Sequence, residues 1–211
     1  MSVKLRKDEI LMNRKIGIYA SAVNLVAVIC FAVSMLFRFD FGSYFSSMFI
    51  ALSFVPMMCG YAFFAGKEAK SAGYISVAFA TIYATIILLV YYAQLTTVRQ
   101  NDLAFQAAIL LDFQQCSLMF NYDLLGYAIM SLATFFAGLT ITTYQAKEDK
   151  LLKCLLMIHG VFFVSCLLTP MLGVFKTGSP EWIGIAVLEF WCLYFCPISI
   201  LSLSRFSRMQ K

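Results

Sequence analysis

Charged residues are scarce in this sequence, and their scarcity excludes most classes of soluble protein. Only 13% of the 211 residues are Asp, Glu, Lys or Arg, whereas 62% are hydrophobic. Soluble domains carry about 25% charged and about 45–50% apolar residues. A chain of this length has too much surface to hide that excess from water. The composition excludes a soluble enzyme, a disordered chain and a nucleic-acid-binding protein, and it indicates an integral membrane protein.

The sequence also lacks the motifs that identify a reaction or a cofactor. It contains no HExxH, GxSxG, P-loop or GxGxxG pattern. Its one histidine and scattered cysteines do not form the four-ligand sets of zinc or iron–sulfur sites. Seven cysteines, six of them inside apolar runs, do not suit a disulfide scaffold either. We therefore expect no cofactor, no metal and no recognisable catalytic set, which speaks against an enzyme.

Long apolar runs are what the sequence has instead. A bilayer core about 30 Å thick is crossed by roughly 20 apolar helical residues. Six such runs occur, at about 16–37, 44–65, 72–95, 124–143, 151–175 and 182–203. Their apolar character is continuous rather than alternating, which favours helices. The predicted fold is all-α: one six-helix membrane domain over 16–203, with a basic N-terminal segment, 1–15, and a basic tail, 204–211.

The Lys and Arg residues are distributed unevenly between the two predicted sides of the membrane. With six spans, thirteen of the 16 fall on the side that receives both termini and the turns at 66–71 and 144–150. Only Arg38, Arg99 and Lys176 fall on the other side. Cytoplasmic flanks of membrane helices are enriched in Lys and Arg. We therefore predict a multi-pass protein of the cell membrane with both termini in the cytoplasm.

One connection between the predicted spans is long. The outer segment 96–123 contains neither Gly nor Pro, so nothing in it breaks a helix. Asn101 and Asp102 can cap a helix that follows them. We predict an amphipathic helix from Leu103 to about Cys116 at the outer interface. The alternative is that the third span continues straight out of the membrane.

A few polar side chains interrupt the spans and are the candidate functional residues. Ionisable groups inside a membrane are costly and mark functional sites by default. Glu189 lies seven residues into the sixth span on a small, polar face that we expect to point inward, with Trp191 and Phe195 projecting elsewhere. Kinks at Pro170 and Pro197 are expected to splay the last two helices around it. The predicted ligand cavity is lined by Glu189, Cys192, His159, Asn24, Thr169 and Asp123.

These features favour a protein that binds or transports a small, mostly apolar or amphiphilic ligand within the lipid bilayer. A structural, hydrogen-bonded role is the alternative for both Glu189 and His159. One alternative function is an accessory or structural subunit that binds another membrane protein or a second copy of itself. Another is an intramembrane enzyme that modifies a lipid, with a His and a Glu as acid and base.

The charge distribution generates a test of topology. A cysteine introduced at Lys67 (Lys67→Cys), in a variant without the native cysteines, is expected to resist a membrane-impermeant maleimide in intact cells, because the 66–71 turn is predicted to be cytoplasmic. Permeabilising the cells is expected to restore labelling. Full labelling of intact cells would contradict the predicted orientation.

Overall fold

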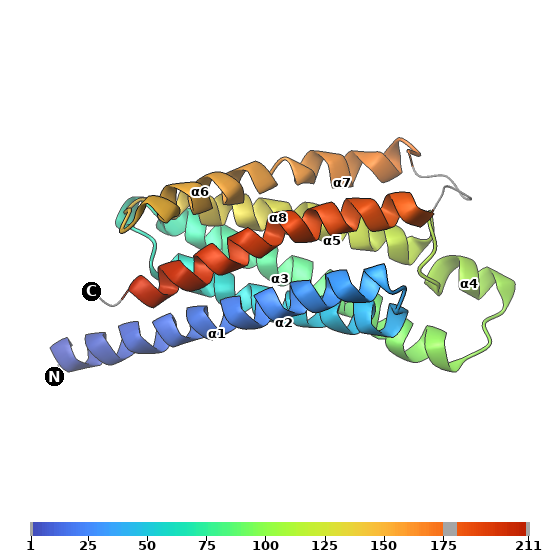
Figure 1. Cartoon of the computed structure of the whole chain (residues 1–211), viewed down its shortest axis with the longest axis horizontal. Coiled ribbons are helices and arrows are strands. Elements are labelled where there is room, and N and C mark those ends of the chain that lie inside the picture. The colour runs from blue at the N-terminus through green and yellow to red at the C-terminus, as the bar shows by residue number, and fades with distance from the viewer. Residues whose placement is uncertain (1, 175–180, 210–211) are drawn as a thin grey trace.

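The chain forms a bundle of long helices (Figure 1). The computed structural model describes residues 2–174 and 181–209, and within them no residue lies in a β-strand. Six helical stretches are long and apolar enough to cross a membrane, which confirms the six predicted spans. In chain order the helices are α1 (Ser2–Leu36), α2 (Asp40–Phe63), the 3-10 helix η1 (Lys67–Ala69), α3 (Lys70–Ala93), the π-helix η2 (Gln94–Val98), α4 (Phe105–Leu111), α5 (Leu118–Leu139), α6 (Lys147–His159), α7 (Phe162–Met171) and α8 (Glu181–Arg208).

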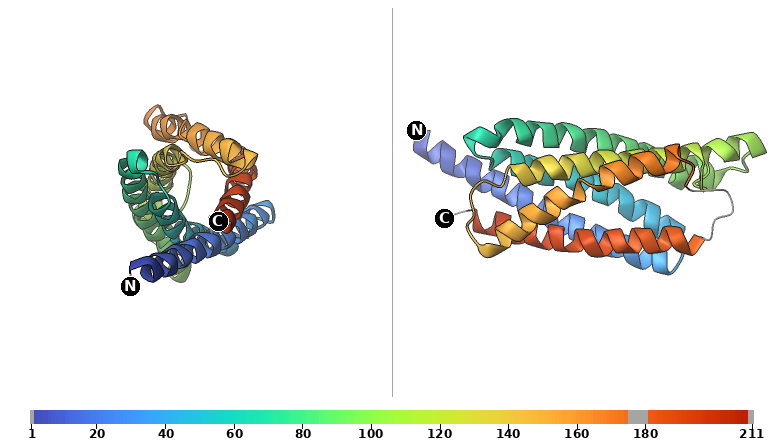
Figure 2. Two further views of the ribbon diagram at one scale, coloured as in Figure 1. Left: turned by 90° about the vertical axis from the view of Figure 1, so that its left-hand side faces the viewer. Right: turned by 90° about the horizontal axis from the view of Figure 1, so that it is seen from above.

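The helices follow one another around a ring. Helix α1 packs on α2 and α8, α3 packs on α2 and α5, and α6 packs on α5 and α8. Seen end-on, the first and last helices are neighbours, so α8 closes the ring (Figure 2). Helix α1 begins and α8 ends at one end of the bundle, which we call the terminal end; the α1–α2 turn and α4 lie at the other, the distal end (Figure 1).

The fifth span is interrupted, although not where its proline predicts. Helix α7 includes Pro170, and α8 runs through Pro197 without interruption. The break lies between α6 and α7, where Gly160 and Val161 donate their amides three residues back, to Met157 and Ile158. Such short bonds tighten the helix, and glycine is a weak helix former. The interruption of the fifth span therefore lies at a glycine, and both prolines lie within continuous helix.

The long distal connection is only partly helical. Helix α3 extends into η2, and a seven-residue helix, α4, follows at Phe105–Leu111, so the helix predicted from Leu103 to Cys116 is shorter than expected. Buried Gln94 holds this segment in place, because its Nε2 donates to the Leu111 carbonyl at 2.7 Å and its Oε1 accepts from the Phe113 amide at 3.1 Å. The location of α4 at the membrane surface stays a prediction.

Two glycines allow α1, α2 and α8 to approach closely near the terminal end. A Cβ on Gly17 would lie 2.7 Å from the Phe206 ring, and one on Gly60 would lie 2.9 Å from the same ring. Phe206 is fully buried, and its ring also packs on Tyr61 at 5.1 Å between centroids. The Tyr61 hydroxyl pairs with Ser202 at 2.6 Å. The two glycines thus form a slot that a single aromatic ring fills.

Basic side chains link neighbouring helices at the terminal end. Asp149 at the start of α6 is fully buried, and its carboxylate pairs with Arg205 and Arg208 of α8, each at 2.9 Å. Arg14 donates to the Phe206 and Ser207 carbonyls, and Lys70 donates to two carbonyls at the end of α2. The last carbonyls of a helix have no partner within it. Some of the Lys and Arg residues at this end therefore donate hydrogen bonds to the last carbonyl groups of the helices.

The glycine slot generates a prediction. Gly17→Ala is expected to lower the free energy of unfolding by about 1–3 kcal/mol, the usual cost of overpacking, because its methyl group meets the buried Phe206 ring. Gly184→Ala on α8 is the matched control, since nothing lies within 4 Å of its added Cβ; a better helix former there keeps or raises stability. Thermal unfolding of both purified variants measures the difference. Equal melting temperatures would contradict the slot.

Candidate functional site

Polar side chains converge inside the bundle, toward its distal end, from helices α3 and α5. These helices pack side by side, with the Ser76 hydroxyl bonded to the Ala133 carbonyl at 2.8 Å and Gly126 fitting against Ile87. Further toward the distal end, Asp123 and Tyr127 lie one helical turn apart on one face of α5. Tyr83 and Tyr91 lie on the facing side of α3, and Ser47 of α2 lies beside Tyr91. We call Asp123, Tyr83, Tyr91, Tyr127 and Ser47 the tyrosine–acid cluster.

Contacts among these residues show that they form one group. The rings of Tyr83 and Tyr127 are 5.9 Å apart between centroids. The Tyr91 side chain lies close enough to interact with the Asp123 carboxyl group. All five residues are buried, and Asp123 is only 5% exposed. The three helices therefore bring one acid and four hydroxyl groups together in the interior.

Most of the polar atoms in the cluster have no hydrogen-bond partner. The Ser47 Oγ, the hydroxyl groups of Tyr83 and Tyr127, and the Asp123 Oδ1 are all buried and unpaired. An unsatisfied buried polar group costs about 1–3 kcal/mol. Four of the six buried side-chain atoms without a partner among the described residues lie in this one neighbourhood, where each needs a physical explanation because buried polar groups are nearly always paired.

Aromatic rings surround the cluster. Trp191 of α8 packs edge-on to Tyr127 at 5.2 Å, and Phe54 of α2 packs edge-on to Tyr83 at 5.3 Å. At the distal end, Phe113 packs on Tyr91 at 5.8 Å. This ring belongs to the segment that Gln94 holds, so the long distal connection covers the cluster. The site therefore places a carboxyl group among packed aromatic rings.

Glu189 lies at the margin of this region. Its side chain is partly exposed, and its Oε1 is buried without a partner. Cys192, one turn further along α8, is buried and lies near both Glu189 and Tyr127. Trp191 and Phe195 also point inward and are buried, so the prediction that they project away from the interior is wrong. The ring of six spans encloses more space than small side chains fill, and aromatic residues occupy it.

His159 is held by hydrogen bonds at both ring nitrogens. The Trp191 Nε1–H donates to Nε2 at 3.1 Å, and Nδ1 lies 2.8 Å from the Thr134 hydroxyl, which itself donates to the Ser131 carbonyl. Because an indole can only donate, Nε2 is the acceptor and Nδ1 carries the proton. This relay joins α5, α6 and α8 and supports the structural alternative for His159.

Asn24 belongs to a second network, between α1, α2 and α8. Its Nδ2 donates to the Ile50 carbonyl at 3.2 Å and to Ser53 at 3.0 Å, and its Oδ1 accepts from Ser199 at 3.0 Å. The side chain is fully buried, and the three bonds use all of its amide hydrogens and its oxygen. Asn24 and His159 are therefore held apart from each other, each in its own network.

The six predicted site residues thus divide into three groups. Asp123 lies in the tyrosine–acid cluster, with Cys192 and Glu189 next to it, while His159 and Asn24 are bound in structural networks. Thr169 lies half-buried on α7, which packs on α5. Among residues 2–174 and 181–209, no three His, Cys, Asp or Glu side chains gather as metal ligands.

Sequence inspection missed the tyrosines of the site. Tyrosines at the ends of spans are ordinary membrane-interface residues, and that explanation suits Tyr91 and Tyr92. Tyr83 and Tyr127, however, lie well inside their spans. A phenol at that depth needs a hydrogen-bond partner, and this signal could have found them. Comparisons with protein-family models, with characterised proteins and with solved structures find no match to this chain.

The His159 relay generates a prediction. Thr134→Val is expected to lower the free energy of unfolding by about 1–3 kcal/mol, because the isosteric valine leaves the His159 Nδ1–H unpaired in the interior. Thr85→Val, which removes an exposed hydroxyl bonded only to the Thr81 carbonyl, is the matched control. Thermal unfolding gives the comparison. Since the chain has one histidine, its ¹⁵N spectrum reads the tautomer directly, and a proton on Nε2 would contradict the relay.

Proposed function

We propose that the tyrosine–acid cluster binds a small organic cation with an apolar body, and that the protein takes up or transports such molecules within the membrane. The observation that supports this most is the unpaired Oδ1 of buried Asp123 among the unpaired hydroxyls of Tyr83, Tyr127 and Ser47. A ligand that donates hydrogen bonds and carries positive charge would satisfy these atoms together.

The surroundings of the acid suit a cation more than a neutral polar molecule. The negative faces of aromatic rings attract cations, most strongly where water is excluded. Tyr127 lies one turn from Asp123, and its ring packs on those of Tyr83 and Trp191. The Arg and Lys residues with described contacts lie at the two ends of the bundle, away from Asp123. The interior at this depth therefore holds an ionisable acid without a protein cation beside it.

Helices α7 and α8 supply the expected route of entry from the membrane. No residue of α7 is buried, and none from Trp182 to Phe190 on α8 is buried. Glu189 lies on this loosely packed stretch, beside Cys192. We propose that Glu189 attracts the cation at the edge of the bundle and that Asp123 binds it inside. The basic side chains at the terminal end support a cytoplasmic location for both termini.

Asp123→Asn tests the binding site. In nanodiscs of zwitterionic lipid, wild-type protein is expected to bind 2-phenylethylammonium, which has a charged hydrogen-bond donor, in preference to neutral 2-phenylethanol, as measured by equilibrium dialysis. Asp123→Asn is expected to weaken binding of the cation at least tenfold, because it removes the charge and keeps the shape. Asp102→Asn, an exposed acid of the distal connection, is the matched control. Equal binding by all three proteins would contradict the proposal and favour the accessory-subunit function.

A pair of tyrosine variants separates binding from folding. Tyr83→Phe removes an unpaired buried hydroxyl, so the ligand-free protein is expected to keep or gain stability while binding of the cation weakens. Tyr61→Phe removes a hydroxyl bonded to Ser202 and is expected to lower stability and leave binding unchanged. A loss of stability in Tyr83→Phe as large as in Tyr61→Phe would contradict the assigned role of Tyr83.

A further inference from the structure

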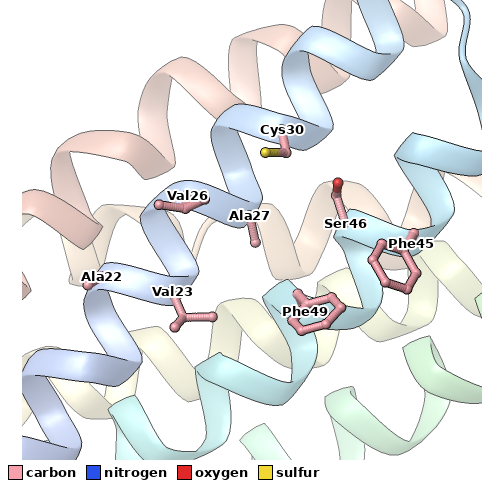
Figure 3. A pocket seen from close by; sticks show the side chains of 8 residues that line it. All are labelled: Ala22, Val23, Val26, Ala27, Cys30, Phe45, Ser46 and Phe49. Carbon is pink, nitrogen blue, oxygen red and sulfur yellow. The ribbon is translucent and has the colours of Figure 1, made fainter.

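A second site lies on the outside of the bundle, in a groove between α1 and α2 (Figure 3). The groove has a volume of about 360 Å³. Val23, Val26 and Cys30 of α1 form one wall, and Phe45 and Phe49 of α2 form the other. All five side chains are exposed, so the groove opens to the surroundings of the bundle.

Small residues give the groove its depth. Ala22 and Ala27 on α1, and Ser46 on α2, lie between the larger side chains that form its walls. Ser46 is the one residue of the lining with a polar side-chain oxygen or nitrogen. Both helices are long and apolar enough to cross a membrane. In a bilayer the groove would face hydrocarbon rather than water, and an apolar chain is the occupant that its chemistry admits.

The length and depth of the groove match one leaflet of a bilayer. From Ala22 to Cys30 the lining extends over about 12 Å of helix, at 1.5 Å per residue. One leaflet is about 15 Å of hydrocarbon, half of a core about 30 Å thick. Phe45 lies five residues from the first residue of α2, so the groove is in the half of the membrane nearer the distal end. An acyl chain entering from that side would lie along it.

Arg99 lies at the distal end of the groove. Three exposed phenylalanines at four-residue intervals on α2 form a continuous ladder, with Phe41 5.9 Å from Phe45 and Phe45 5.0 Å from Phe49 between centroids. The guanidinium carbon of Arg99 lies 4.9 Å from the Phe41 ring centroid, at the distal end of that ladder. Arg99 is therefore a cation at the distal end of the phenylalanine ladder that forms one wall of the groove.

We propose that the groove binds one acyl chain of an anionic phospholipid, with Arg99 holding the phosphate of its headgroup. Guanidinium groups pair with phosphate through two parallel hydrogen bonds. The site is independent of the tyrosine–acid cluster, because the groove lies on the outer faces of α1 and α2 and includes none of the cluster's residues.

Native mass spectrometry of the purified protein tests the site, with phosphatidylglycerol and phosphatidylcholine of the same acyl chains as probes. Wild-type protein is expected to retain one phosphatidylglycerol at least fivefold more often than one phosphatidylcholine. Cys30→Trp, which fills the groove, is expected to reduce retention of both lipids at least fivefold. Arg99→Gln is expected to keep chain binding and to abolish the preference for phosphatidylglycerol.

Cys59→Trp is the matched control, because Cys59 is also an exposed cysteine, on α2, and does not line the groove. It is expected to retain lipid as the wild type does. If Cys30→Trp fails to fold, Val26→Trp fills the same groove from another exposed position on α1. Equal loss of lipid in the Cys30 and Cys59 variants would overturn the proposal. So would equal retention of the two lipids by wild type, or a dimer that Cys30→Trp dissociates, which would make a second copy of the chain the occupant.

Discussion

The absence of water from the bilayer core is the constraint on which the rest of the structure depends. A polar atom inside a membrane span must find its partner in the protein. Asn24 meets that demand through Ile50, Ser53 and Ser199, and His159 meets it through Thr134 and Trp191. Each network joins three helices and includes α8. The polar residues of the spans therefore fix which helices are neighbours, while the apolar residues fill the space between them.

Against this background the tyrosine–acid cluster is an exception. Its acid and hydroxyl groups lie as deep as the satisfied networks, yet four of its polar atoms have no partner. Stability alone would favour phenylalanine at Tyr83 and Tyr127, because the same rings would pack without unpaired hydroxyls. The lost free energy is characteristic of a site that binds something else. The same physical argument that assigns Asn24 and His159 to structural networks is the reason for proposing Asp123 as the binding residue.

The sequence predicted the spans well because hydrophobicity over twenty residues is a strong signal. The prediction of which face of α8 points into the bundle was wrong. Small side chains were expected to mark the interior, whereas Trp191 and Phe195 are buried. The break in the fifth span depends on local hydrogen bonding at Gly160. It was not predicted because Pro170, ten residues away, is the stronger sequence signal for an interrupted helix. Asp123 was found as an acid near a membrane span. Two of its tyrosine partners, Tyr83 and Tyr91, come from another helix, and only the packing of α3 on α5 brings them to it.

The neighbourhood of α1 and α8 has a consequence for the order of assembly. Asn24 and Ser199 are 175 residues apart, and at 5–20 residues per second the ribosome needs roughly 10–35 s to make that length of chain. During that interval the Asn24 Oδ1 has no Ser199 to donate to it, whereas its amide hydrogens already find Ile50 and Ser53 on the next helix made. The α1–α2 hairpin can thus form early. The contact between α1 and α8, which closes the ring, can form only after α8 has been made.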